Sequence, residues 1–156
     1  MEALGLFDYG GGGYHCIWLA PEEFEIFRRR GLFAVTCPGS NAKLASGIAP
    51  VAEFLCRGIP VAVGTDGAAS NNCLDMFREM FLVTGLSKLR ERDASAVPAK
   101  QVLRMATVGG ARAMGLKECE TLTPGQKADL IMIDLNQPNM HPLSDPEKNL
   151  VYSGSK

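Results

Sequence analysis

The chain has 156 residues, which is within the size of one domain and enough to bury a hydrophobic core. Its residues are 46% hydrophobic and 21% charged and its net charge is −1, so neither the basic surface of a nucleic-acid-binding protein nor the charge excess of a disordered one is present. No apolar run approaches the roughly 18 residues that a membrane helix needs, and the N-terminus has no signal-peptide pattern, so no membrane partner is expected.

The N-terminal part of the chain predicts a turn, a strand and a helix. The glycines at 10–13 are read as a flexible turn, because no phosphate-binding motif follows them, and residues 14–18 are read as a strand. Pro21 begins a helix at its first position, and three arginines at 28–30 lie in its last turn. Gly31 follows directly, as is typical of a helix end.

The middle of the chain alternates strands with helices. Residues 32–36 and 59–63 are apolar runs without alternation, which indicates parallel strands covered on both faces. Residues 37–41 end the first of these strands and are read as a loop, in which Ser40, Asn41 and Lys43 shape the backbone rather than touch a substrate. Residues 50–56 form a short helix before the second strand.

A longer helix is predicted after residue 72. Asn72 is expected to cap it, with Asp75 three residues later in a box-like arrangement, although Asn71 and Asn72 also lie where they could reach a ligand. Helical spacing assigns its buried face to four apolar residues. These are Leu74, Phe77, Phe81 and Leu89.

The C-terminal part predicts further helices and then a small β element. One helix begins at Pro98, and another begins near Thr107 and ends at Gly115. Residues 121–126 read as a strand and turn, and the apolar residues 130–133 as a strand. Three strand–helix units in series predict an α/β fold with a parallel sheet, too few for a closed barrel of typically about 250 residues.

The five cysteines are an odd number at wide spacings, without a C-x-x-C pair. This pattern is typical of reduced thiols in a cytosolic protein rather than of a disulfide framework. The sequence therefore predicts a cytoplasmic protein with free thiols.

Asp66 is the first candidate for chemistry. It follows the apolar strand at 59–63 and is followed by a loop of small residues at 67–72. The carboxyl end of a buried strand is a place where catalytic groups collect. Without further context, an aspartate between glycines is more often a turn former.

The order of motifs along the chain resembles the amidohydrolase superfamily. Within it, the chain is most similar to the branch of methylthioadenosine/S-adenosylhomocysteine deaminases and chlorohydrolases. The motifs that carry this resemblance are His15-Cys16, residues 38–47, residues 64–67 with 70–75, Ala106-Thr107 with Gly110-Ala111, and residues 125–130.

The resemblance implies a metal-dependent hydrolase on a distorted (β/α)₈ barrel beside a small β-sandwich. Residues 1–118 would correspond to barrel strands six to eight with their helices, and residues 119–156 to an incomplete small β element. Asp66 stands where the family has its eighth-strand metal ligand and proton-transfer carboxylate, and His15 stands where it has the sixth-strand histidine that orients water or the intermediate. The implied cofactor is a divalent metal, zinc ahead of iron, and the implied reaction removes an amine from a purine-type ring.

The chain also departs from the family pattern. Its only histidines are His15 and His141, it has no H-x-H motif, and three of the four implied metal ligands have no counterpart. The chain therefore resembles a C-terminal piece of a longer enzyme and is expected to be inactive alone. The alternative is a structural or oligomerising remnant of the family, because unpaired strand edges favour self-association into homo-oligomers. A small open-sheet binding protein has only the glycine run in its favour.

Overall fold

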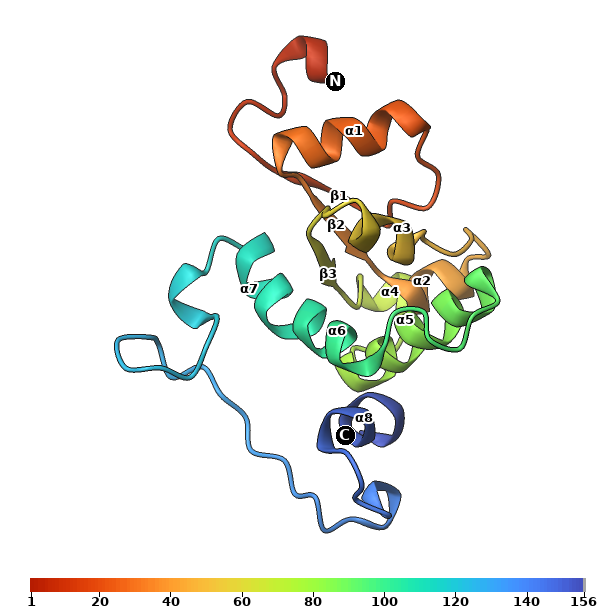
Figure 1. The fold of residues 1–156 in the computed structure, drawn as a ribbon, viewed down its shortest axis with the longest axis vertical. Helices are drawn as coiled ribbons and strands as arrows, with labels where there is room; N and C mark the ends of the chain where they lie inside the picture. The colour runs from red at the N-terminus through yellow and green to blue at the C-terminus, as the bar shows by residue number, and fades with distance from the viewer. Residues whose placement is uncertain (156) are drawn as a thin grey trace.

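A three-stranded parallel sheet lies at the centre of the computed structural model, which describes residues 1–155 (Figure 1). The strands β1 (Gly12–Tyr14), β2 (Phe33–Thr36) and β3 (Val61–Val63) lie side by side in chain order. Their register pairs Tyr14 with Val35 and Val35 with Ala62. Because all three strands are parallel, their carboxyl ends meet at one edge of the sheet. The predicted α/β class is confirmed.

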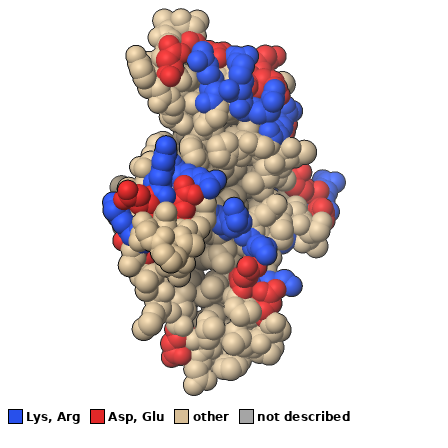
Figure 2. Space-filling view, turned by 60° about the vertical axis from the view of Figure 1, so that its left-hand side comes forward, with Lys and Arg blue, Asp and Glu red and all other residues tan. Residues whose placement is uncertain are grey.

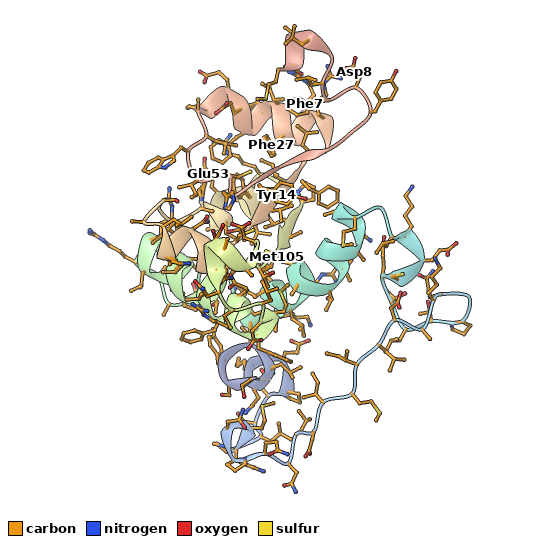
Figure 3. All side chains as sticks on the ribbon, turned by 180° about the vertical axis from the view of Figure 1, so that it is seen from behind. Phe7, Asp8, Tyr14, Phe27, Glu53 and Met105 are labelled. Atoms are coloured by element: carbon orange, nitrogen blue, oxygen red, sulfur yellow. The ribbon has the colours of Figure 1, made fainter. Side chains whose placement is uncertain are left out.

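The connections between the strands are helical. α1 (Pro21–Arg30) links β1 to β2, and α2 (Pro38–Lys43) and α3 (Val51–Cys56) link β2 to β3. α1 matches the prediction: proline is its first residue and Gly31 ends it with a left-handed φ of 63°. Phe27 of α1 packs on Gly13 of β1, where an added Cβ would lie 3.1 Å from the Phe27 ring (Figure 3).

Helices follow β3 and complete the core. They are α4 (Ala68–Asn71), α5 (Met76–Glu91), α6 (Ala99–Arg104), a π-helical turn (Met105–Gly109), α7 (Gly110–Ala113) and α8 (Pro146–Ser153). Short 3₁₀ helices span Glu2–Leu4, Lys117–Cys119 and Pro138–Met140. The path from α6 to α7 is continuous and lies against β3, and α8 packs on α5 and α6 (Figure 1). Gly109 permits this approach, because a Cβ there would clash with the Val61 carbonyl oxygen.

Ion pairs connect the N-terminal segment to α1. Arg29 lies 2.6 Å from Glu2, Arg30 lies 3.1 Å from Asp8, and Asp8 is labelled at this end of the molecule in Figure 3. Figure 2 shows the basic groups here beside acidic ones, so their charges are largely balanced. Exposed pairs of this kind contribute little stability, because water and salt screen their charges.

The first strand lies earlier than predicted. It covers residues 12–14 rather than 14–18, so part of the expected glycine turn belongs to the sheet. The backbone leaves the extended conformation directly afterwards, with φ of 65° at His15 and 48° at Cys16. Positive φ angles cannot continue a strand, so the sheet ends at Tyr14.

The buried face of α5 also differs from the prediction. Leu74 and Phe81 are each 50% exposed and Leu89 is 74% exposed, whereas Phe77 is partly buried against the core. The buried side is formed by other residues, namely Glu79, Met80, Val83, Thr84 and Ser87. The helix carries apolar residues on several sides, so its spacing alone did not identify the side that faces the sheet.

The helix caps around residue 72 were assigned incorrectly. Asn72 ends α4 in a left-handed conformation, with φ of 67°, and does not begin α5. Asp75 caps α5 instead, and its side chain accepts a hydrogen bond from the backbone N–H of Phe77 at 3.0 Å. Asparagine tolerates left-handed backbone well, which explains its suitability for a helix end.

The predicted strands at 121–126 and 130–133 are absent from the described part of the chain. Leu130, Ile131 and Met132 are 56%, 76% and 93% exposed on an irregular segment. A strand needs a partner for its backbone hydrogen bonds, and none of the residues 1–155 forms a ladder with this segment.

Across the same residues, no helix combines the length and apolar character that a membrane crossing requires. All five cysteines are free thiols.

Candidate active site

The carboxyl ends of the three strands bring the predicted site residues together. His15 directly follows β1, α2 follows β2 after one residue, and Asp66 follows β3 after Gly64 and Thr65. Because the strands are short, parallel and adjacent, these segments meet at one sheet edge (Figure 1). This edge therefore contains both residues that the sequence singled out.

The carboxylate of Asp66 is fixed by two donors. Its Oδ2 accepts a hydrogen bond from Ser40 Oγ at 2.6 Å, and its Oδ1 accepts one from the backbone N–H of Gly67 at 2.7 Å. The backbone of Asp66 has a φ of 60°, a left-handed conformation that is uncommon outside glycine and asparagine. The side chain is 29% exposed, so it remains accessible from solvent.

The same contacts stabilise the charged form of Asp66. The hydrogen bond from Ser40 is the largest cause that lowers the pKa of Asp66, followed by the Gly67 N–H and, more weakly, by the charge of His15. Partial desolvation acts in the opposite direction but does not outweigh them. Asp66 is therefore a carboxylate at neutral pH, able to accept a proton or a cation.

His15 faces Asp66 and is held from the other side of its ring. Its Nδ1 lies 2.7 Å from Oδ1 of Asn41, and its Nε2 lies 3.9 Å from Oδ2 of Asp66. An amide oxygen only accepts hydrogen bonds, so Nδ1 is the donor in this contact. The ring therefore directs Nε2 toward the carboxylate, at a distance that leaves the two groups unbonded.

Helix α2 supplies both holding groups, which the sequence analysis missed. Residues 37–41 were read as a loop, but Ser40 and Asn41 lie on a helix and are only 1% and 2% exposed. They contact Asp66 and His15 directly rather than merely shaping the backbone. Pro38 at the first helical position was the signal that could have identified this helix.

Lys43 at the end of α2, and Asn71 and Asn72 at the end of α4, form hydrogen bonds that connect the segments around the site. Lys43 Nζ donates to the carbonyl oxygen of Ala69 at 2.9 Å and to Oδ1 of Asn72, which joins α2 to α4. Asn71 is buried and its Nδ2 donates to the carbonyl oxygen of Thr65 at 2.6 Å. Lys43 thus connects α2 to α4, and its predicted lack of contact with substrate stays a prediction.

The described residues provide an incomplete metal site. Within residues 1–155, no group of three or more His, Cys, Asp or Glu side chains is placed to hold a metal ion. Asp66 fits as one ligand, because carboxylate oxygens bind divalent metals and this one is ionised and partly open. A stable site needs about four ligands, so Asp66 alone does not form one.

Removing the hydroxyl of Ser40 is expected to raise the pKa of Asp66 toward that of an ordinary aspartate. A lowered folded-state pKa contributes stability above the unfolded-state pKa, and this contribution is lost as pH falls through the folded-state pKa. In Ser40→Ala this contribution shrinks, so the variant is less stable than the unmodified chain above the unfolded-state pKa, and the difference disappears as pH falls through the folded-state pKa of Asp66. An NMR titration of the Asp66 carboxyl carbon measures the shift, and an unchanged pKa in this variant would contradict the assigned cause.

Comparison with known proteins gives one family. A family model described as the amidohydrolase family matches residues 1–155. The chain is 50% identical over 154 residues to a 5-methylthioadenosine/S-adenosylhomocysteine deaminase of Moorella thermoacetica, covering 98% of this chain and 36% of that protein. It is 45% identical over 153 residues to a 5'-deoxyadenosine deaminase of Methanosarcina mazei, covering 98% and 35%. The chain thus spans about a third of the length of these relatives.

Solved structures show the same relationship. An adenosine deaminase from Xanthomonas campestris with bound zinc superposes with a TM-score of 0.92 and 39% identity, over 97% of this chain and 35% of that one. The atrazine chlorohydrolase of Arthrobacter aurescens complexed with zinc gives a TM-score of 0.86 and 26% identity, over 92% and 32%. Both of these similar structures hold zinc.

Proposed function

The chain belongs to the amidohydrolase family, and from this premise we propose that it forms part of a metal-dependent enzyme that deaminates a purine-type ring. The observation that carries the proposal is the ionised Asp66, fixed by Ser40 and Gly67 at the sheet edge with His15 Nε2 3.9 Å away. The similar proteins named as deaminases of methylthioadenosine, S-adenosylhomocysteine and 5'-deoxyadenosine support a small adenine nucleoside as substrate.

The fold supports a more specific assignment. We propose that β1, β2 and β3 are strands six to eight of a (β/α)₈ barrel, and that the small β element lies within residues 119–156, ahead of α8, which packs on α5 and α6. The parallel order of the three strands, the helix after each of them and the TM-score of 0.92 to a zinc-containing deaminase support this placement. The exposed apolar residues at 130–133 are consistent with a segment that pairs elsewhere in the whole protein.

The metal in this proposal is zinc. Asp66 supplies one ligand, and residues of the longer protein outside 1–155 supply the remaining ligands. The similar structures with zinc support this choice over iron. A bound divalent metal lowers the pKa of a coordinated water to about 7 and so supplies a nucleophile at neutral pH.

The residues of this chain would then perform proton transfer and positioning. Asp66 accepts the proton of the attacking water and delivers it to the leaving amine, a role for which its ionised state is required. His15 presents Nε2 to the same space and, with its proton on Nδ1, accepts a hydrogen bond there from the attacking water and so orients it. Ser40 and Asn41 hold these two side chains in their relative orientation.

An inactive structural or oligomerising remnant of the family is the second candidate. The specific observation in its favour is that the described residues contain no cluster of three potential metal ligands. This candidate predicts neither stoichiometric metal nor turnover in any form of the protein that contains this chain.

The deciding experiment measures metal content and ammonia release. The 156-residue chain and a longer protein that contains it are purified and assayed with and without added zinc, using methylthioadenosine, S-adenosylhomocysteine and 5'-deoxyadenosine. We expect substoichiometric metal and no ammonia from the chain alone, and zinc-dependent ammonia release from the longer protein. Stoichiometric zinc without turnover on any adenine nucleoside would contradict the substrate proposal. Tight metal and turnover in the chain alone would contradict the need for outside ligands.

A further inference from the structure

A buried carboxyl group lies directly behind the Asp66 loop. Glu79 of α5 is 0% exposed, which is unusual for a glutamate. Its Oε2 accepts the backbone N–H of Gly39 at 2.8 Å, and its Oε1 accepts Nδ2 of Asn71 at 2.8 Å. A buried polar group is costly unless it is hydrogen-bonded, so these two contacts are what makes its burial tolerable.

The two contacts of Glu79 reach both elements of the candidate site. Gly39 lies in the first turn of α2, directly before Ser40. The same Nδ2 of Asn71 also donates to the carbonyl oxygen of Thr65, the residue before Asp66. One carboxyl group therefore connects the helix that holds Asp66 to the loop that carries it.

Position 39 must be a glycine for Glu79 to come this close to α2. A Cβ at Gly39 would clash with Oε1 of Glu79 and would lie 3.0 Å from the amide atoms of Asn71. The close approach of α2 to α5 therefore requires a residue without a side chain.

We propose that Glu79 is a positioning residue for Asp66. It fixes α2 relative to the backbone of Thr65, so that the Ser40 hydroxyl lies within hydrogen-bonding distance of the Asp66 carboxylate. The hydrogen-bond partners of the Asp66 carboxylate are Ser40 and Gly67, and Glu79 acts on it indirectly, through Gly39, Asn71 and Thr65. The effect of this positioning on catalysis rests on the proposed function. The effect of Glu79 on the structure of the Asp66 loop does not.

The variant that tests this inference is Glu79→Gln. Glutamine has the same size, but one acceptor oxygen becomes an NH₂ group, which then faces either the Gly39 N–H or the Asn71 NH₂. One of the two contacts is lost in either orientation. We expect amide hydrogen exchange in residues 38–43 and 65–72 to become about tenfold faster or more, beyond any change in global stability.

Thr84→Val is the matched control on the same helix. Thr84 is also 0% exposed, and its Oγ1 donates to the carbonyl oxygen of Val97 at 2.8 Å, far from the Asp66 loop along the chain. This variant removes that hydrogen bond and the 3.3 Å contact between Thr84 Oγ1 and the Tyr152 hydroxyl, at nearly constant volume. We expect it to accelerate exchange near residues 84–97 and to leave residues 65–72 at the rate set by global stability.

A second variant keeps the test decisive if Glu79→Gln does not fold. Asn71→Ala removes the contacts to Thr65 and Glu79 but leaves the bond between Glu79 and Gly39. It should accelerate exchange in residues 65–72 selectively and spare residues 38–43. Uniform acceleration in this variant, or identical exchange patterns in Glu79→Gln and Thr84→Val, would overturn the inference.

The enzymatic readout separates this inference from the proposed function. In the longer zinc-dependent protein, Glu79→Gln should lower kcat roughly ten- to a hundredfold with little change in KM, whereas Thr84→Val should change neither. If the unmodified protein neither binds zinc nor releases ammonia while the exchange pattern holds, the proposed function is wrong and the positioning by Glu79 stands. If turnover is present but exchange in Glu79→Gln matches Thr84→Val, the positioning by Glu79 is wrong.

Discussion

Replacing Asp66 with asparagine is expected to lower kcat/KM for deamination roughly 10²- to 10⁴-fold, because an amide cannot accept the proton that a carboxylate accepts. The backbone should tolerate the change, since asparagine adopts the left-handed φ of 60° found at this position. The amide oxygen can still accept from the Gly67 N–H, and the amide NH₂ can donate to Ser40 Oγ. The measurement is steady-state ammonia release by a longer protein that contains this chain, assayed with added zinc, with metal content determined on the same sample.

Asp75→Asn is the matched control for this substitution. Asp75 also accepts a backbone N–H, that of Phe77, but it caps α5 rather than lying at the strand edge. Asparagine is nearly as good a helix cap as aspartate, so stability should hardly change. Turnover in Asp66→Asn within about tenfold of the Asp75→Asn control would contradict a proton-transfer role for Asp66.

Replacing His15 with asparagine is expected to lower kcat/KM roughly 10²- to 10³-fold. Asparagine tolerates the φ of 65° at this position and places an amide near the site of Nδ1, which can keep the contact to Asn41. It removes Nε2, the atom that lies 3.9 Å from the Asp66 carboxylate. The loss should therefore appear in kcat, with KM changed much less.

His141→Asn provides the control with the same chemical change. His141 is exposed on the C-terminal segment, away from the strand ends that carry His15 and Asp66. Its substitution should leave kcat and KM unchanged. Equal kinetics of the two histidine variants would show that Nε2 of His15 does not take part in the reaction.

The sequence by itself determined some of the local elements, namely α1 and the strands β2 and β3. Pro21, the arginines at 28–30 and Gly31 specified α1, because helix ends are set by adjacent residues. The apolar runs at 32–36 and 59–63 specified two parallel strands, and the second of them located Asp66 at a strand end. The placement of Asp66 beside His15 followed from the resemblance to the family and not from periodicity.

Tertiary structure alone decided which groups meet at the site. Ser40 reaches Asp66 across 26 positions in the chain, and Gly39 reaches Glu79 across 40, so no local pattern connects them. The buried face of α5 and the absence of a strand at 130–133 were mispredicted for the same reason. Both depend on which distant segment of the chain packs against these residues. Local propensity fixes helices and strands within a few residues, whereas burial and hydrogen-bond partners at long range are fixed only when the elements pack.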